Sequence, residues 1–523
     1  MFDNSAHLLK SKLVMHKALN LVLVAIILSI PIALSAQKIV YSEPQRDDVR
    51  RTDFEIIGKI SGNFLVFTNN RSDNNISIFD DEMKLQQRVK LEFLPDKIIN
   101  TYFIPFPDFC YMIYEYQKKN IVHCAAVKID GQAKNLGEPI DLDTTQIGFA
   151  ASNKIYTAIS SDDKQKIMIF KINSKNSKNF LFTTFLFNQK LELLDRHRLN
   201  MPMEERSESF TDFLLDNEGT LVFGKFLRNS GSDYVSKVSI ITKGPTADDF
   251  SVKDLGTGDR LLDEIKIKVD NNNKIYILTG FYYKQKRGSI EGLYTVLWDK
   301  ATDSKLKESL GVFSDELRAA AKSSESNLKL AFNDFFINQI IIKRDGGFLL
   351  VSEAQYTTSR GGYFNRWDYM NGYGYNSFLS PIDYYSYPYY SPWNRFGGYS
   401  PNNAVRYHAE NIMILSFDKN CNLEWSNVIP KTQYDDESEN LISNHIMNTG
   451  GELHFLYNQY DHRNILLNDQ SISPEGKITR YPTIKNLDKG YDFMPRYAKQ
   501  VSGKQMIVPC LYKNYLCFAK IDF

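Results

Sequence analysis

The sequence lacks an excess of charge of either sign. Its 63 Lys and Arg residues nearly balance 62 Asp and Glu residues, for a formal net charge of +1. A nucleic-acid-binding domain usually carries a basic patch or stripe, and none is visible. We therefore expect no nucleic-acid partner, and no electrostatic attachment to an acidic membrane surface.

The sequence also lacks the linear signatures of catalysis and cofactor binding. It contains no His-Glu-x-x-His helix, Gly-x-Ser-x-Gly elbow, phosphate loop or dinucleotide fingerprint. Residues 270–273 have the composition of a calcium loop but no loop glycine or distal glutamate, which favours a hairpin turn. The acidic run 435–439 favours a solvated loop over a calcium site. We assign no catalytic residue and expect no cofactor.

Histidine is scarce, with eight residues in all. His197 lies beside Asp195, but a single histidine specifies neither a nucleophile nor a metal. His445 and His454 flank the Gly450 turn and could approach each other, yet no third ligand is identifiable. We therefore expect no metal site.

Cysteine is also scarce, and the five residues all follow residue 100. Cys510 and Cys517 flank Lys513-Asn514 symmetrically, so a two-residue turn would place them opposite each other, with Cα atoms about 4.5–5.5 Å apart. That separation suits a disulfide in an oxidising compartment, while burial as free thiols is the alternative. Cys110 and Cys124 are nearly opposed in another hairpin, and Cys421 has no evident partner.

The first 36 residues have the pattern of a signal peptide. Lysines precede an apolar run at 21–34, and the small residues Ala33, Ser35 and Ala36 follow it. An uncleaved anchor is the alternative, since 18–36 carries no charge, but Pro31 and the small residues favour cleavage. We expect an exported protein, periplasmic, on the cell surface or secreted, with no membrane span after cleavage.

A turn followed by an apolar strand recurs along the chain, most clearly at 346–351 (Gly-Gly-Phe-Leu-Leu-Val). Glycine and asparagine tolerate the turn, and β-branched and aromatic residues suit the strand. Similar strands begin near residues 62, 108, 153, 219, 273, 450 and 503. A spacing of roughly 45–75 residues is typical of four-stranded propeller blades.

The repeats predict an all-β fold, a β-propeller of four-stranded blades spanning residues 37–523. We expect eight blades, with seven as the alternative because residues 166–199 show no regular pattern. The last blade lacks a fourth strand, which residues 38–41 could supply, closing the ring and covering a sheet edge. Residues 314–322 predict one short helix with a serine cap. Two tandem sandwiches are the rival fold, but no linker divides the chain.

Two short stretches resemble known proteins. The run Asp418-Lys419-Asn420-Cys421-Asn422-Leu423-Glu424-Trp425 resembles the Asp-turn-Trp repeat of secreted and quinoprotein-type propellers. The exit at 35–37, followed by Ile39-Val40-Tyr41 and these repeats, resembles uncharacterised secreted β-propeller-like proteins of Bacteroidota. The resemblance implies the fold and the export, and no activity.

Residues 357–408 interrupt the repeats with a Tyr/Gly-rich insertion. We expect it between the second and third strands of the sixth unit, as a recognition surface, since Tyr and Trp give stiff contact area with a polar tip. A self-packed cap and a loosely ordered tract are the alternatives. The candidate ligand-binding residues are Tyr363, Trp367, Tyr369, Tyr373, Tyr385, Tyr389, Trp393 and Tyr399.

The sequence therefore favours a monomeric, non-enzymatic binding or scaffold protein. Its expected partner is an envelope polysaccharide or protein, recognised through the insertion. The alternative is a carbohydrate-active propeller enzyme with paired carboxylates at its central channel, about 5–10 Å apart.

Overall fold

The computed structural model describes residues 37–48, 52–70, 73–148, 150–151, 154–176, 179–203, 208–210, 213–228, 234–258, 260–263, 265–285, 288–322, 332–359, 362–363, 405–436, 438–461, 464–482 and 490–523. The expected signal peptide, residues 1–36, lies outside them. Within the described residues the chain is almost entirely β-strand, with one α-helix and one 3-10 turn, η5 (Pro495–Tyr497).

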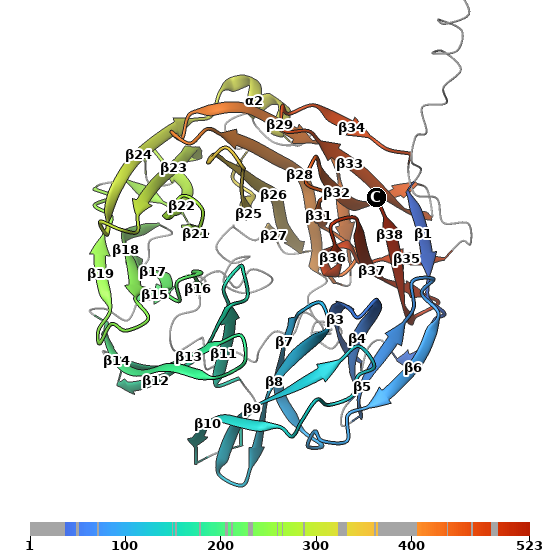
Figure 1. The fold of residues 1–523 in the computed structure, drawn as a ribbon. Coiled ribbons are helices and arrows are strands. Elements are labelled where there is room, and N and C mark those ends of the chain that lie inside the picture. The colour runs from blue at the N-terminus through green and yellow to red at the C-terminus, as the bar shows by residue number, and fades with distance from the viewer. Residues whose placement is uncertain are drawn as a thin grey trace, which may run out of the picture. The chain divides into compact units, whose positions relative to one another are not determined.

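After two short strands at 38–48, which belong to the last sheet, the chain forms three antiparallel meanders of four strands (Figure 1). The first contains β3 (Asp53–Ile60), β4 (Asn63–Asn70), β5 (Asp73–Phe79) and β6 (Leu85–Lys90). The second contains β7 (Ile98–Pro105), β8 (Phe109–Lys118), β9 (Ile121–Asp130) and β10 (Ile140–Gln146). The third contains β11 (Tyr156–Ser160), β12 (Lys166–Asn176), β13 (Asn179–Asn188) and β14 (Leu193–Pro202).

A ten-stranded sheet follows and consists of two meanders. One contains β15 (Glu208–Phe210), β16 (Leu214–Leu215), β17 (Leu221–Arg228), β18 (Val235–Lys243) and β19 (Ser251–Asp254). The other contains β20 (Leu261–Leu262), β21 (Lys266–Asp270), β22 (Ile275–Tyr283), β23 (Ile290–Asp299) and β24 (Ser304–Val312). They are joined through β18 and β20, where Val235 pairs with Leu262.

Three further sheets complete the described strands. One contains β25 (Phe335–Ile342), β26 (Phe348–Ser359), β27 (Gly362–Tyr363), β28 (Val405–Phe417), β29 (Leu423–Ile429) and β30 (Gln433–Asp435). The next contains β31 (Asn444–Asn448), β32 (Leu453–Asp461), β33 (Asn464–Ile472) and β34 (Ile478–Arg480). The last contains β35 (Tyr491–Phe493), β36 (Lys499–Ser502), β37 (Gln505–Tyr512) and β38 (Tyr515–Asp522), with β1 (Lys38–Tyr41) and β2 (Gln45–Asp48) on β38.

The prediction of an all-β, propeller-like fold of four-stranded antiparallel sheets is confirmed. Consecutive sheets bury apolar side chains against each other, as Leu65 of β4 and Met112 of β8 do in one core cluster. Strands of the last sheet pack against the first, where the rings of Phe518 and Phe54 lie 5.4 Å apart. Each fully buried Phe of this kind contributes roughly 1.5–3 kcal/mol by leaving water.

The helix predicted at 314–322 is confirmed as α2 (Asp315–Ala321). Ser314 caps it, because its side-chain oxygen accepts a hydrogen bond from the backbone N–H of Leu317 at 3.2 Å. Arg318 then ties the helix to β23 by donating to the carbonyl oxygens of Ile290 and Glu291. The helix thus connects the ten-stranded sheet to the sheet of β26.

The third meander differs from the sequence expectation in two respects. The strand near residue 153 is the first of its sheet, β11, whereas the similar strands near residues 62 and 108 are the second of theirs. Residues 166–199 are regular, since β12 and β13 pair along almost their whole length. The turn before β12 contains no glycine: Lys164 adopts φ 56°, and the Asp163 carboxylate accepts from the N–H of Gln165. The turn signal was therefore missed.

The Tyr/Gly-rich insertion connects two neighbouring strands. β26 and β28 pair from Phe348 and Phe417 outward to Ser359 and Val405. β27 adds a short pairing in which Tyr363 lies opposite Thr358. The root of the insertion is thus a long two-stranded ribbon of backbone hydrogen bonds. In the part of the chain that the structure describes, no helix is long and apolar enough to span a bilayer.

Candidate functional site

The structure describes little of the expected recognition surface itself. Of the eight aromatic residues, only the backbone of Tyr363 is described, in β27. The other seven lie outside the described residues: Trp367, Tyr369, Tyr373, Tyr385, Tyr389, Trp393 and Tyr399. The root of the insertion is described, and the candidate site is built from it.

A row of four rings, the aromatic ladder, begins at this root. Tyr356 of β26 lies opposite His408 of β28, which lies opposite Tyr434 of β30, so the three side chains share one face. The rings of Tyr356 and His408 stack at 4.3 Å, and those of His408 and Tyr434 are 6.4 Å apart. Tyr460 of β32 continues the row, stacked 5.9 Å from Tyr434. The ladder therefore links the insertion to the next sheet.

The rings of the ladder are uncharged and partly exposed. Tyr434 is 46% exposed and Tyr460 39% exposed. Burial and the nearby charge of Arg406 lower the pKa of His408 to about 4, so its ring is neutral at physiological pH. Arg406 lies 4.5 Å from the centre of the Tyr434 ring and donates two hydrogen bonds to Asp436. The salt bridge fixes Arg406 against the ring.

Next to the ladder lies a cavity of about 430 Å³, between the connection from β29 to β30 and the strands β32 to β34. We call it the tyrosine cavity. Its lining residues are Pro430, Lys431, Thr432, Tyr434, Tyr457, Asn458, Gln459, Tyr460, Asn468, Asp469, Gln470, Arg480 and Tyr481.

The cavity opens where the apolar packing between two sheets ends. Phe455 of β32 packs against Leu349 and other residues of the preceding sheet. Two and four residues further on, Tyr457 and Gln459 lie on the same face, because strand side chains alternate. Here the floor is polar: Gln470 donates to the Tyr457 hydroxyl, and Asn468 donates to Gln459. Amide and hydroxyl groups thus replace the aliphatic side chains.

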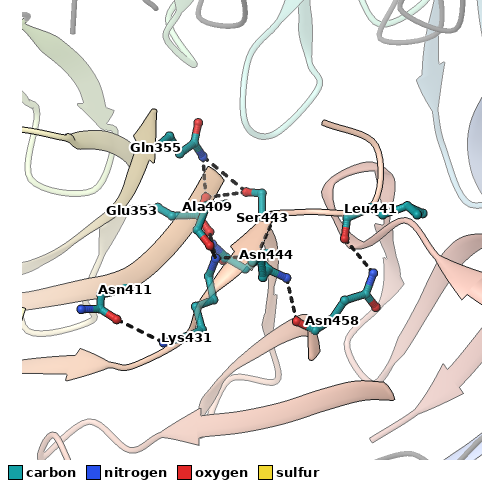
Figure 2. A network of polar contacts seen from close by, with 10 residues as sticks. Glu353, Gln355, Ala409, Asn411, Lys431, Leu441, Ser443, Asn444 and Asn458 are labelled. Atoms are coloured by element: carbon teal, nitrogen blue, oxygen red, sulfur yellow. Dashed lines mark hydrogen bonds and ion pairs between the residues drawn. The ribbon is translucent and has the colours of Figure 1, made fainter. Parts of the chain in front are cut away.

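One wall of the cavity is held by a buried ion pair (Figure 2). The Lys431 ammonium lies 2.7 Å from a carboxylate oxygen of Glu353, with side chains 1% and 0% exposed. Glu353 also accepts hydrogen bonds from Ser443 and Asn444. Burial alone would raise the pKa of Glu353, but the Lys431 charge and these hydrogen bonds lower it, so the carboxylate is ionised.

Further hydrogen bonds extend this arrangement, the Glu353 network, across three sheets. Lys431 donates to the Ala409 carbonyl oxygen and to Gln433, which donates to the Asn458 carbonyl oxygen. Asn458 donates to the carbonyl oxygens of Leu441 and Phe493. Since the charges are compensated and inaccessible, this network positions the loop at the cavity wall and offers no free catalytic carboxylate.

Two minor candidate sites have structural roles. The hairpin turn predicted at 270–273 is confirmed, since the Asp270 carboxylate accepts from the N–H groups of Asn272 and Asn273. His197 is hydrogen-bonded to Asp195, which also forms an ion pair with the buried Lys243. Among the described residues, no group of three His, Cys, Asp or Glu side chains could hold a metal ion.

Two other expectations were only partly right. The acidic run 435–439 is not simply a solvated loop: Glu439 is 1% exposed and forms an ion pair with Arg496. A buried carboxylate at that position is possible because its partner comes from a distant segment. His454 lies opposite Met447 rather than His445 and is hydrogen-bonded to Asp469 at 2.8 Å.

Of the two cysteine pairs that the sequence placed opposite or nearly opposite each other, one has the expected strand register. Cys510 and Cys517 are directly opposite, buried and free, with their sulfur atoms 3.0 Å apart. Cys110 and Cys124 are not opposed, since Cys124 pairs with Glu115 and the two thiols lie in different core clusters. The bridge between Cys510 and Cys517 stays a prediction.

Sequence reasoning missed the described part of the site. Tyr434 precedes the acidic run, which drew attention only as a possible calcium site. The residues next to Tyr460 and Arg480 form no motif that would mark either side chain as a binding residue. The only hint was that the insertion begins and ends next to Tyr356 and His408. The register of β26, β28 and β30 was needed to align the rings.

Comparison with known proteins gives no family. No protein-family model matches the chain, and no curated protein does. Solved structures whose backbone is similar to parts of this chain include Prolyl oligopeptidase B from Galerina marginata. It is 8% identical over 89% of this chain, with a TM-score of 0.40. This chain spans 56% of that protein's length.

Two other similar structures are a polysaccharide lyase and a protein of unknown function. One is an ulvan lyase of polysaccharide lyase family PL25 bound to -[GlcA(1-4)Rha3S]-, 11% identical over 80% of this chain and 90% of its own, with a TM-score of 0.37. The other is a protein of unknown function from Bacteroides caccae, 10% identical over 72% of this chain and 94% of its own, with a TM-score of 0.27. At these values no residue role is carried over to this chain.

Proposed function

We propose that this protein is an exported, non-enzymatic binding protein that recognises an envelope polysaccharide through its insertion, the aromatic ladder and the tyrosine cavity. The observation that carries the proposal is the ladder, which runs from the root of the insertion to the cavity rim. Export rests on the signal-peptide pattern of residues 1–36.

The chemistry of the surface suits a sugar chain. Flat, partly exposed rings such as Tyr434 and Tyr460 offer stacking faces with a polar tip. The amide groups of Gln459 and Asn468 can both donate and accept, which matches hydroxyl groups. A pocket with a few convergent polar groups and aromatic walls is the usual form of a small-ligand site.

At the tyrosine cavity, the state of two carboxylates favours binding over carbohydrate-active catalysis. Such an enzyme needs two accessible carboxyl groups facing each other. At the cavity, Glu353 is inaccessible and ion-paired with Lys431, and Asp469 is hydrogen-bonded to His454. Neither carboxylate is placed to act as a general acid or nucleophile.

We also propose that the meanders are the eight blades of a propeller closed by the N-terminal segment. The division of the ten-stranded sheet into two meanders supports the number. The hydrogen bond from the Ser42 N–H to the Phe518 carbonyl oxygen, at 2.8 Å, supports the closure. A rigid platform of this kind would hold the binding surface at its rim.

The test is binding of the purified exported protein to a panel of envelope polysaccharides. One variant lacks residues 360–404, with Ser359 joined to Val405 by an Asn-Gly turn, which suits two directly paired residues. A second carries Tyr434→Ala and Tyr460→Ala, and the control is Tyr515→Ala at the similarly exposed Tyr515.

We expect both site variants to lose affinity while the control does not. Two stacking rings should contribute about 1–3 kcal/mol together, or roughly 5- to 150-fold in Kd. If the intact protein binds no polysaccharide, or if all variants bind equally well, the proposal is wrong. Binding to an envelope protein in place of a polysaccharide would also contradict it.

A further inference from the structure

Three charged residues line the tyrosine cavity, and two of them already interact with other side chains. Lys431 is neutralised by Glu353 at 2.7 Å, and Asp469 is hydrogen-bonded to His454 at 2.8 Å. Arg480, by contrast, is exposed, and its guanidinium group makes no hydrogen bond or ion pair with the described residues. The cavity therefore presents one available positive charge.

This charge lies far from the aromatic end. Arg480 of β34 pairs with Gln470 of β33, which pairs with Phe455 of β32. Tyr460 is five residues further along β32 and reaches the cavity from the opposite face of that strand, and its Cα atom lies about 17 Å from that of Phe455 at the usual rise. That is longer than a single pyranose ring, so the cavity can contact successive sugars of one chain.

The aromatic end carries Arg406, which is paired with Asp436, and the carboxylates of Asp435 and Asp492 near Tyr460, so its net charge is negative. Burial and the charges of Asp435, Asp492 and Asp436 raise the pKa of the Tyr460 hydroxyl to about 12. An anionic group would be repelled there and attracted at Arg480. Between the two ends, the accessible amides of Gln459 and Asn468 supply uncharged hydrogen-bonding groups.

From this distribution we propose that the tyrosine cavity selects an acidic saccharide, with the anionic group of one sugar on Arg480 and an uncharged ring stacked at Tyr434 and Tyr460. The proposal rests on the proposed function and adds the ligand class. The anion is a carboxylate or a sulfate ester, since the planar guanidinium fork fits the oxygen pairs of both.

The experiment compares polymers that differ only in charge. The probes are polygalacturonate against its methyl-esterified form, and dextran sulfate against dextran. They are tested with the intact protein, with Arg480→Gln and with the control Arg344→Gln. Arg344 is also exposed and lies in the turn before β26, at the opposite end of that strand from the insertion.

We expect the intact protein and R344Q to bind at least one charged polymer about tenfold or more tightly than its uncharged form. In R480Q that preference should disappear while binding of the uncharged form is unchanged. Which pair shows the preference identifies the anion as carboxylate or sulfate.

Two results would overturn the inference, and they are distinguishable. Equal binding of charged and uncharged forms, or a preference that R480Q retains, defeats the ligand class and leaves polysaccharide binding standing. Absence of binding to all four polymers and to the wider panel defeats the proposed function and this inference with it. Unchanged melting temperatures of both variants confirm that they are folded.

Discussion

The buried ion pair between Glu353 and Lys431 should be among the most sensitive positions of the chain. Replacing Lys431 with Met keeps an unbranched side chain out to its fourth heavy atom but removes the ammonium group. The Glu353 carboxylate would then remain at 0% exposure, with hydrogen bonds from Ser443 and Asn444 but no compensating charge. The variant is therefore expected to be strongly destabilised.

The expected loss is about 3–5 kcal/mol, the usual consequence of leaving one partner of a buried pair uncompensated. Residues 39–522 form one compact unit. At roughly 2 cal/mol/K per residue, the unfolding entropy of a unit of this length is about 1 kcal/mol/K. The melting temperature should therefore fall by roughly 3–5 °C, if the unit unfolds cooperatively.

The assay is differential scanning calorimetry at pH 7 with a matched control. Lys237→Met removes an exposed lysine that lies 3.8 Å from Asp254, and should cost at most about 1 kcal/mol. The double variant Glu353→Leu with Lys431→Met should recover part of the loss, because no charge is left buried. A Lys431→Met loss no larger than that of the control would refute the reasoning.

The same pair predicts a dependence on pH. The pKa of Glu353 is lowered in the folded state, so its stabilising contribution is present above the pKa of an unfolded glutamate, about 4.3. That contribution is lost as the pH falls through the lower, folded value. Melting temperatures measured between pH 7 and pH 3 should therefore converge for the intact protein and the double variant.

Three remaining predictions concern other sites. Burial raises the pKa of Glu115 to about 7 despite hydrogen bonds from the N–H groups of Ile155 and Tyr156, so its ionisation destabilises the fold as the pH rises from about 4.3 to 7. Glu115→Gln should thus be more stable at pH 8, by up to about 3 kcal/mol, and a loss of stability there would contradict this. In protein produced by export to an oxidising compartment, Cys510 and Cys517 should resist thiol alkylation under denaturing, non-reducing conditions; complete alkylation would show that no bridge forms. Reduction of the bridge should lower stability by about 2.5 kcal/mol for an eight-residue loop, measured by calorimetry with and without reductant.

Local chemistry in the sequence was sufficient for several elements. Ser314 followed by two acids predicted the cap and start of α2, because capping depends on neighbouring residues alone. The two-residue turn at Lys513-Asn514 set the register that places Cys510 opposite Cys517. A turn residue followed by a run of apolar, β-branched and aromatic residues predicted the strands, since such side chains suit a pleated surface.

The same kind of reasoning failed where the signal was non-local. The turn before β12 uses Asp163 and a left-handed Lys164 in place of glycine, so the regular strands at 166–199 were not recognised. Glu439 belongs to an acidic run whose composition predicted a surface loop. It is buried because it forms an ion pair with Arg496, 57 residues later in the chain. A partner at that distance leaves no trace in the local pattern.

What the sequence determined by itself was therefore the class of fold, the recurrence of its four-stranded units and the aromatic composition of the insertion, because these follow from periodicity and turn chemistry along the chain. Only the tertiary structure decided where a ligand could bind. The register of β26, β28 and β30 aligns Tyr356, His408 and Tyr434, and the packing of two sheets adds Tyr460 and Arg480. These residues are brought together by strand pairing and sheet packing between segments far apart in the chain, which no local pattern encodes.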